Sequence, residues 1–321
     1  MVRSLRKRNS ETRTRSVRTT FISGVTVGFF SKLFSGKGNK SLKVANVAKR
    51  FELQGRTGQG SMSRVFKAYD KDIGRNICLK LLDKVKTKRF EERFKTMGLK
   101  KPPEGEVCAS LNHKNCVKTY EHGITTEGEP YLAMEWIEGL GLNYLIETNS
   151  PQIQGQRMNY LGQLCDAVTY LHGVKYLHRD ICPRNVMVDK DGVIKLIDFG
   201  LTIPYTPPFC VPGNRTGTVD YLAPEIIKRM STDHRVDLFS LGVTAYEMFT
   251  GALPWERSPS SEETLRRHMN HPPRDPKDVK KDMELDLARV LLKSVDRDRN
   301  VRYPSASQFK EAMLKLERQD Y

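Results

Sequence analysis

One polar pattern, at residues 176–201, constrains the fold more than any other part of the chain. The sequence there is YLHRDICPRNVMVDKDGVIKLIDFGL, with Asp180 in a short loop, Asn185 five residues later, and Asp198 after a second apolar run. The apolar runs within residues 185–197 flank an Asp-Lys-Asp-Gly turn, which predicts a β-hairpin. Two oxygen-bearing side chains suited to Mg²⁺ are therefore expected beside this hairpin, near a carboxylate that can accept a proton.

The first half of the body, residues 48–137, is expected to form a small sheet with one helix. A helix is expected over residues 104–112, entered through two prolines. β-branched and aromatic residues bounded by turn signals predict short strands. These strand-like runs are at residues 51–53, 64–69, 76–82, 117–120 and 131–134.

The second half, residues 138–321, is expected to be mostly helical. Residues 161–171 place leucines and a valine on one face at helical spacing, and residues 236–249 are apolar nearly all round, as in a buried helix. Ser305 followed by Gln308 is typical of a capping box and predicts a last helix through Leu316.

Basic residues are concentrated at the N-terminal end. Residues 1–50 contain 13 Lys and Arg and one acidic residue, so they carry +12 of the net charge of +16. Residues 1–47 are expected to be a disordered basic tail, because residues 1–20 have few apolar side chains. Residues 21–34 are apolar but too short to span a bilayer, so they suit a peripheral contact with an anionic membrane. The alternatives are contact of the tail with nucleic acid, or no specific partner.

The six cysteines are scattered and form no C-x-x-C pair. This pattern predicts reduced thiols in a cytoplasmic protein rather than a disulfide framework or a zinc site.

A glycine-rich loop lies between the first two expected strands. Gly58 and Gly60 allow the backbone to approach phosphate oxygens closely. A Rossmann dinucleotide site would need a helix directly after the glycines. The residues that follow, including Val65, are strand-like instead, so that kind of site is excluded.

A lysine, Lys80, lies within the apolar run at residues 77–82. An unpaired buried charge is costly, so this ammonium group needs a carboxylate partner. Glu104 is the expected partner and Glu106 is the second candidate. The alternative is a lysine whose ammonium group extends to solvent.

Taken together, these motifs resemble those of the protein-kinase family, over about residues 50–318. They occur in the family's order along the chain. The matching segments are Gly58-x-Gly60 with Val65, Ile77-Cys-Leu-Lys80, His178-Arg-Asp180 with Asn185, Asp198-Phe-Gly200, Ala223-Pro-Glu225, Asp237-x-x-Ser240-x-Gly242 and Arg302. The resemblance implies an α+β bilobal fold, with a β-rich N-lobe at 48–137 and a larger, mostly helical C-lobe at 138–321.

The resemblance also implies roles for these residues. Lys80, held by Glu104, would bind the α- and β-phosphates of ATP, and Asp180 would orient the attacking hydroxyl group. Asn185 and Asp198 would hold Mg²⁺, with Mn²⁺ as an alternative metal. The nucleotide would also contact the glycine loop, an apolar slot and the backbone that connects the two lobes, at Gly58, Gly60, Val65, Cys78, Lys80, Met134, Glu135, Ile137 and Met187.

Three features depart from the family pattern. One is that Glu104 follows two prolines and precedes Gly105, so its helix is expected to start late or to need ordering.

The other two departures are single positions. Ser63 occupies the place of the third loop glycine. Cys182 lies where serine/threonine kinases usually carry a lysine that contacts the γ-phosphate, and a neutral thiol cannot supply that charge. Arg184, two residues later, is expected to compensate in part, so it joins Asp180, Lys80 and Glu104 as a candidate catalytic residue.

The expected function is that of a serine/threonine kinase acting on protein substrates. Gly217-Thr-Val-Asp-Tyr221 and Pro183 fit the serine/threonine pattern, and the catalytic loop resembles that of bacterial, eukaryotic-type kinases. The alternative is a pseudokinase scaffold that binds nucleotide with little turnover, which Cys182 and Ser63 would favour.

Regulation is expected in the loop at residues 201–222. In the family, an arginine at the position of Arg179 often pairs with a phosphate on this loop, and Thr202, Thr206 and Thr216 are hydroxyl candidates besides Thr218. We expect phosphorylation of Thr206 or Thr216. The alternative is that the four prolines of the loop already stiffen it, so that no phosphate is needed.

Overall fold

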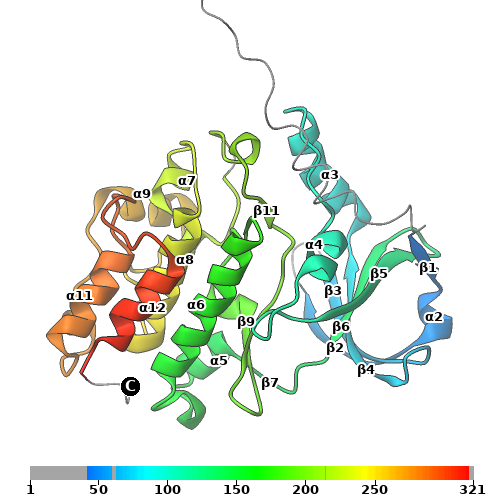
Figure 1. The fold of residues 1–321 in the computed structure, drawn as a ribbon, viewed down its shortest axis with the longest axis horizontal. Helices are drawn as coiled ribbons and strands as arrows, with labels where there is room; N and C mark the ends of the chain where they lie inside the picture. The colour runs from blue at the N-terminus through cyan, green and yellow to red at the C-terminus, as the bar shows by residue number, and fades with distance from the viewer. Residues whose placement is uncertain (1–41, 60–62, 214, 318–321) are drawn as a thin grey trace, which may run out of the picture. The chain divides into compact units, whose positions relative to one another are not determined.

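The computed structural model describes residues 42–59, 63–213 and 215–317. These residues form the two-lobed α+β fold that the sequence predicts, with a sheet-rich lobe followed by a helical one (Figure 1). The expected disordered stretch at residues 1–41, Gly60 of the glycine loop, and the last four residues lie outside the described residues.

The N-lobe is built on one six-stranded sheet, in the order β1-β5-β6-β4-β3-β2. Its strands are antiparallel except for the pairing of β1 with β5, which is parallel. The five strands after β1 lie where the sequence predicts strands, with longer bounds. The strands are β1 (Lys43–Ala45), β2 (Phe51–Gln59), β3 (Ser63–Asp70), β4 (Arg75–Leu82), β5 (Thr119–Thr125) and β6 (Pro130–Glu135).

Strand β1 adds residues to the sheet ahead of residue 48, the expected start of the N-lobe. Val44 pairs with Ile124 of β5, and helix α2 (Val47–Arg50) follows directly. The side chain of Asn46 caps α2 by accepting a hydrogen bond from the Lys49 N–H at 3.0 Å. The body of the protein therefore includes residues that precede the expected boundary.

Two helices lie beside the sheet, α3 (Lys84–Lys95) and α4 (Glu104–Ser110). Helix α4 is the predicted helix and packs on β5 and β6. Helix α3 was not expected from the sequence, because its side chains are mostly charged and only two of them, Phe90 and Phe94, are buried. Asp83 caps it by accepting hydrogen bonds from two backbone N–H groups.

The C-lobe is built around two long helices that cross its core. They are α6 (Arg157–Gly173) and α8 (Arg235–Thr250), and 13 of the 16 residues of α8 are buried. Around them lie α5 (Leu142–Glu147), α7 (Pro224–Ile227), α9 (Ser261–Asn270), α10 (Pro276–Val279), α11 (Leu285–Ser294) and α12 (Ala306–Leu314). Single 3₁₀ turns are η1 (Pro151–Ile153), η2 (Pro183–Asn185), η3 (Pro207–Phe209) and η4 (Val219–Tyr221).

The start of the last helix, α12, agrees with the sequence prediction. The side chain of Ser305 accepts a hydrogen bond from the Gln308 N–H at 3.2 Å, as the capping box predicts. Helix α12 ends at Leu314, two residues before the expected end.

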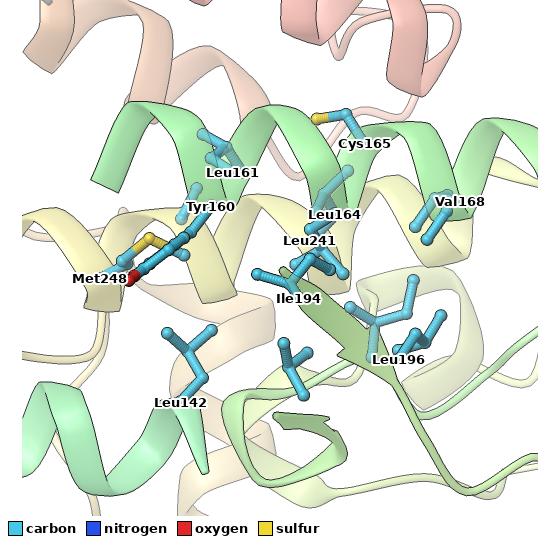
Figure 2. Packing of buried hydrophobic residues seen from close by; sticks show 14 of the residues in the cluster. Leu142, Tyr160, Leu161, Leu164, Cys165, Val168, Ile194, Leu196, Leu241 and Met248 are labelled. Carbon is cyan, nitrogen blue, oxygen red and sulfur yellow. The ribbon is translucent and has the colours of Figure 1, made fainter. Parts of the chain in front are cut away.

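The predicted hairpin forms between β9 (Val186–Asp189) and β10 (Ile194–Leu196). It joins β7 (Gly139–Gly141) in a three-stranded sheet, and β8 (Tyr176–Leu177) pairs separately with β11 (Ile203–Pro204). Figure 2 shows how apolar side chains of α6, α8 and α5 meet those of β10, so the hairpin is fixed on the helical core. This core positions the loops on either side of the hairpin, which carry Asp180, Asn185 and Asp198.

Candidate active site

A buried lysine joins the two lobes. Lys80 lies in β4, between Val65 of β3 and Leu132 of β6 in the sheet register. Its Nζ is 2.6 Å from Glu104 Oε1 in α4 and 2.9 Å from Asp198 Oδ1 in the C-lobe. Lys80 is therefore buried and paired with Glu104, the partner that the sequence predicts. Glu106, the second candidate, is exposed to solvent.

The charges in this cluster stabilise one another. Burial opposes the charge of Lys80, but the carboxylates of Asp198 and Glu104 outweigh burial and hold the lysine pKa above its ordinary value. Burial likewise opposes the charge of Asp198, yet Lys80 and the Gly200 N–H keep the pKa of this carboxyl group below its ordinary value. For Glu104, burial outweighs the effect of Lys80 and holds the pKa of the carboxyl group above its ordinary value. We infer that Glu104 is ionised, because its oxygen is in contact with a charged lysine.

A buried carboxylate anchors the loop that carries Asp180. Asp237 in α8 accepts hydrogen bonds from the backbone N–H groups of His178 and Arg179, at 2.9 and 2.8 Å. His172 Nε2 contacts the same carboxylate at 2.9 Å. Arg179 adopts a positive φ of 70°, which is uncommon for a residue other than glycine. These anchors fix the sharp turn that presents Asp180.

Both oxygens of Asp180 have defined partners. Oδ1 accepts hydrogen bonds from the Thr218 N–H at 2.8 Å and the Thr218 hydroxyl group at 2.7 Å. Oδ2 accepts one from Asn185 Nδ2 at 3.0 Å. A Cβ atom at Gly217, whose φ is +133°, would lie 2.8 Å from the Arg179 carbonyl oxygen, so a glycine is required where the segment before Thr218 approaches the loop.

Asn185 and Asp198 face one pocket from the two ends of the hairpin. The amide nitrogen of Asn185 is engaged by Asp180, so its amide oxygen is turned away from that carboxylate. Asp198 has a φ of +62° and accepts a hydrogen bond from the Gly200 N–H at 3.2 Å. The ring of Phe199 is fully buried against His178, with 5.1 Å between ring centroids, which fixes the direction of the neighbouring Asp198.

The cleft between the lobes holds a mostly apolar pocket of about 340 Å³. This volume lies at the small end of the range for pockets that bind small molecules. Of the residues that the sequence suggested for nucleotide binding, all except the glycines line it: Val65, Cys78, Lys80, Met134, Glu135, Ile137 and Met187. Gly58 pairs with Val65 across β2 and β3.

Four further residues of this pocket were not expected from the sequence. They are Thr57, Val117, Trp136 and Ile197. Thr57 is next to Gly58, and Trp136 lies between Glu135 and Ile137, so these neighbouring predicted positions could have indicated both residues. Val117 and Ile197 belong to separate apolar runs, and no local pattern shows that these runs meet.

The residue that departs from the family pattern, Cys182, is buried rather than directed into the pocket. It packs with Tyr221, Leu222 and Ala223 in an apolar cluster, and its Sγ lies 4.0 Å from the Thr218 hydroxyl oxygen. Burial raises the pKa of this thiol to about 11, so the group is neutral at pH 7. Arg184 is exposed and lines the pocket beside Asn185.

The segment at residues 201–222 is also well anchored. Thr202 is fully buried, whereas Thr206 and Thr216 are partly exposed. At its far end, Glu225 forms a twofold buried ion pair with Arg302, both contacts being 2.8 Å. The Ser240 hydroxyl group donates a hydrogen bond to the Tyr221 carbonyl oxygen at 2.8 Å. The C-terminal end of the segment is therefore anchored to the C-lobe.

Several known proteins are similar in sequence to this chain. The family model for the protein kinase domain matches residues 51–318. Serine/threonine-protein kinase PknB of Mycobacterium leprae is 29% identical over 279 residues, which cover 84% of this chain and 43% of that protein. Aurora kinase of Saccharomyces cerevisiae is 32% identical over 251 residues, covering 78% and 65%. Serine/threonine-protein kinase pkn3 of Myxococcus xanthus is 27% identical over 286 residues, covering 85% and 51%. The chain spans about half the length of the curated relatives it matches.

Proposed function

The chain belongs to the protein kinase family, and we propose that it is a serine/threonine protein kinase that transfers the γ-phosphate of ATP to protein hydroxyl groups. The observation that carries the proposal is the contact of Lys80 with both Glu104 and Asp198. It brings a phosphate-binding cation of the N-lobe beside a metal-binding carboxylate of the C-lobe. The scaffold alternative gains no support from the site, because Lys80, Asp180, Asn185 and Asp198 are all in place.

Lys80 and Asp180 would divide the work of the reaction. Lys80 is charged and buried, so it binds the α- and β-phosphates strongly at the end of the nucleotide pocket. Asp180 has two partnered oxygens that fix its plane, so it can orient a substrate hydroxyl group and receive its proton. Most of the rate enhancement then comes from positioning and charge, since phosphoryl transfer needs little covalent help from the protein.

The residues at the hairpin ends fit a divalent metal such as Mg²⁺. Asp198 is ionised and almost half of its side-chain surface is exposed, and Asn185 lines the same pocket with an amide oxygen to offer. Within the described residues there is no cluster of three or more His, Cys, Asp or Glu side chains that would bind a metal by themselves. Two oxygen ligands suit Mg²⁺, which usually keeps water and phosphate as its other ligands. When bound, the metal would neutralise charge on the phosphates.

Arg184 would supply part of the charge that a lysine at position 182 provides in related kinases. Its side chain is exposed at the pocket, next to Asn185, whereas the Cys182 thiol is buried and neutral. A guanidinium group can bind phosphate oxygens through two hydrogen bonds.

Thr218 supports the preference for serine and threonine. Its hydroxyl group and N–H both bind Asp180, so the segment at residues 201–222 meets the catalytic carboxylate directly. Thr218 also belongs to the Gly217-Thr-Val-Asp-Tyr221 pattern, which resembles that of serine/threonine kinases.

Phosphorylation of Thr206 or Thr216 would add to the order of this segment. Both side chains are partly exposed, which a modifying kinase requires, whereas Thr202 is buried. Arg179 lies beneath the segment as a candidate partner for the phosphate.

The basic N-terminal tail would place the enzyme at an anionic surface. Residues 1–50 carry most of the net charge, and residues 21–34 are apolar, so a cytoplasmic enzyme at the periphery of a membrane is proposed, with nucleic acid as the alternative partner. In the part of the chain that the structure describes, no helix combines the length and apolar character needed to cross a bilayer.

The proposal is tested by incubating the protein with γ-labelled ATP, Mg²⁺ and mixed protein substrates. Phosphoamino acid analysis of the products should show phosphoserine and phosphothreonine but little phosphotyrosine. Nucleotide binding without labelled product would contradict the proposal and favour the scaffold.

A further inference from the structure

Helix α3 contacts the segment at residues 201–222 through two phenylalanines. Phe90 and Phe94 are buried with Leu177, Ile203 and Cys210, and this set is called the α3 cluster below. The rings of Phe90 and Phe94 meet edge to face, with centroids 5.6 Å apart. The ring of Phe94 is also 5.6 Å from that of Phe209, in the 3₁₀ turn η3. A helix of the N-lobe thus covers a segment of the C-lobe with aromatic side chains.

This segment is also bound to the C-lobe by backbone hydrogen bonds. Ile203 pairs with Leu177 between β11 and β8. The Tyr205 N–H donates to the Lys175 carbonyl oxygen at 2.8 Å, and the Thr232 N–H donates to the Cys210 carbonyl oxygen at 2.8 Å. The segment is therefore held between the C-lobe and α3, and the phenylalanines complete its enclosure.

The same helix is connected to Glu104 by a short, stiff stretch of chain. The Leu99 N–H donates to the Phe94 carbonyl oxygen at 2.9 Å, and the ammonium group of the buried Lys101 lies 5.5 Å from the ring centroid of Phe90. Two prolines, residues 102 and 103, then restrict the backbone up to Glu104, the first residue of α4. These contacts and prolines connect α3 to Glu104 within a few residues of chain.

We propose that Phe90 and Phe94 are positioning residues for phosphoryl transfer, because they hold the 201–222 segment closed and keep Glu104 in contact with Lys80. The proposal rests on the kinase function proposed above. Apolar burial needs no phosphate, so the α3 cluster acts in the unmodified chain, and a phosphate on Thr206 or Thr216 would add to it. Phe90 lines a pocket together with Glu104 and Asp198, whereas Phe94 does not line it. The effect of Phe94 therefore passes through Glu104 and the segment.

The first test replaces Phe94 with alanine. We expect Phe94→Ala to lower kcat about tenfold, because the open state then becomes the more populated one. Phe94→Leu, which keeps apolar volume in the cluster, should recover most of the activity. Val85→Ala is the matched control, because Val85 lies on the same helix with 75% of its surface exposed. Phe209→Ala removes the other ring of the Phe94–Phe209 contact. Because Phe209 is only partly buried, this variant tests the proposal if Phe94→Ala does not fold.

The second test separates positioning from general loss of stability. If the cluster acts through the Lys80–Glu104 contact, Glu104→Gln should cost much less in the Phe94→Ala background than in the wild type. A purely structural role would instead make the two effects on kcat multiply. Multiplying effects, or wild-type kcat in both Phe94→Ala and Phe209→Ala, would overturn the proposal.

Hydrogen–deuterium exchange provides a readout that does not depend on catalysis. In Phe94→Ala, amide exchange should become faster in two separate places, residues 104–110 and residues 203–210, and should stay unchanged in α8. Unchanged exchange at residues 104–110 would overturn the proposed connection to Glu104. A wild-type protein that fails to phosphorylate substrates would refute the proposed function, while the exchange result would still decide whether α3 holds both elements.

Discussion

At the scale of single residues, the burial of Lys80 between two carboxylates makes its chemical role separable from its structural one. Lys80→Met should lower phosphoryl transfer at least about a hundredfold, because the charge that binds phosphate is lost. The fold should persist, because burial raises the pKa of Glu104 and the unpaired carboxyl group can take up a proton. Transfer rates and thermal unfolding of this variant check the prediction, with the exposed Lys190→Met as a control. A variant that retains wild-type transfer would exclude Lys80 from phosphate binding.

The Lys80–Asp198 ion pair should be insensitive to pH near neutrality. Asp198 has a lowered pKa, so its contribution to stability is present above about pH 4 and is lost as the pH falls through the folded-state value. Lys80 has a raised pKa, so its contribution is present below about pH 10 and is lost as the pH rises through the folded-state value. The difference in free energy of unfolding between wild type and Asp198→Asn should therefore be constant from about pH 5 to pH 9. A slope near pH 7 would contradict this expectation.

The replacement of a lysine by Cys182 makes a further prediction. Because the thiol is buried and its pKa is about 11, it has no charge to lose, and Cys182→Ala should change kcat by no more than about twofold. Arg184→Ala should lower kcat about tenfold without changing the thermal unfolding temperature, because Arg184 is exposed at the pocket. Steady-state kinetics of the two variants decide the matter. A larger loss of kcat in Cys182→Ala than in Arg184→Ala would show that Arg184 does not replace the missing lysine.

At the scale of elements, the fit of α4 against β5 sets the position of Glu104. A Cβ atom on Gly105 would lie 2.7 Å from Cβ of His122, so Gly105→Ala should push α4 away from the sheet and lower kcat about tenfold. Gly173, at the end of α6, has no atom within 4 Å of such a Cβ, and Gly173→Ala should leave kcat unchanged. Kinetic measurements on both variants, with stability measured in parallel, check this. Equal kcat values would show that α4 tolerates the shift.

Elements differ in how well local sequence predicts them. The β9–β10 hairpin and helices α6, α8 and α12 carry their periodicity or turn residues within a few positions, and the structure confirms them. Helix α3 has two apolar anchors, Phe90 and Phe94, among charged residues, and their partners lie more than 80 positions later in the chain. Strand β1 has three residues and pairs with β5 across a similar distance. Such elements are stabilised by tertiary contacts that no local pattern contains.

The residues of the site likewise divide into those that local sequence predicts and those that depend on tertiary packing. The motif residues, from Lys80 to Asp198, are specified by type and spacing, and the structure brings them together in the cleft. The apolar walls at Val117 and Ile197, and the burial of Cys182, depend on how separate segments pack. Sequence alone could name a missing lysine at position 182, but only the fold places the thiol in the apolar cluster beneath Thr218.

At the scale of the whole molecule, the basic tail and the kinase body should have separable roles. Deleting residues 1–41 keeps β1 and the Asn46 cap, so transfer to a soluble peptide should stay within about twofold of the full chain. The deletion should reduce binding to anionic vesicles, and the binding of the full chain should weaken as salt is added. Sedimentation with vesicles at several salt concentrations measures this. Binding that is equal in both proteins would place the membrane contact elsewhere.

In the proposed reaction, Asp180 directs phosphoryl transfer from ATP bound between Lys80 and Asp198. The most direct measurement is single-turnover transfer to a serine peptide by the wild type and by Asp180→Asn, under conditions where both are saturated with nucleotide. Asparagine preserves the size of the side chain and can still accept a hydrogen bond from Thr218, but it cannot take a proton from the substrate. We predict that the wild type transfers phosphate and that Asp180→Asn is slower by at least about a hundredfold with unchanged nucleotide affinity. Equal rates in the two proteins, or no transfer by the wild type, would contradict the claim.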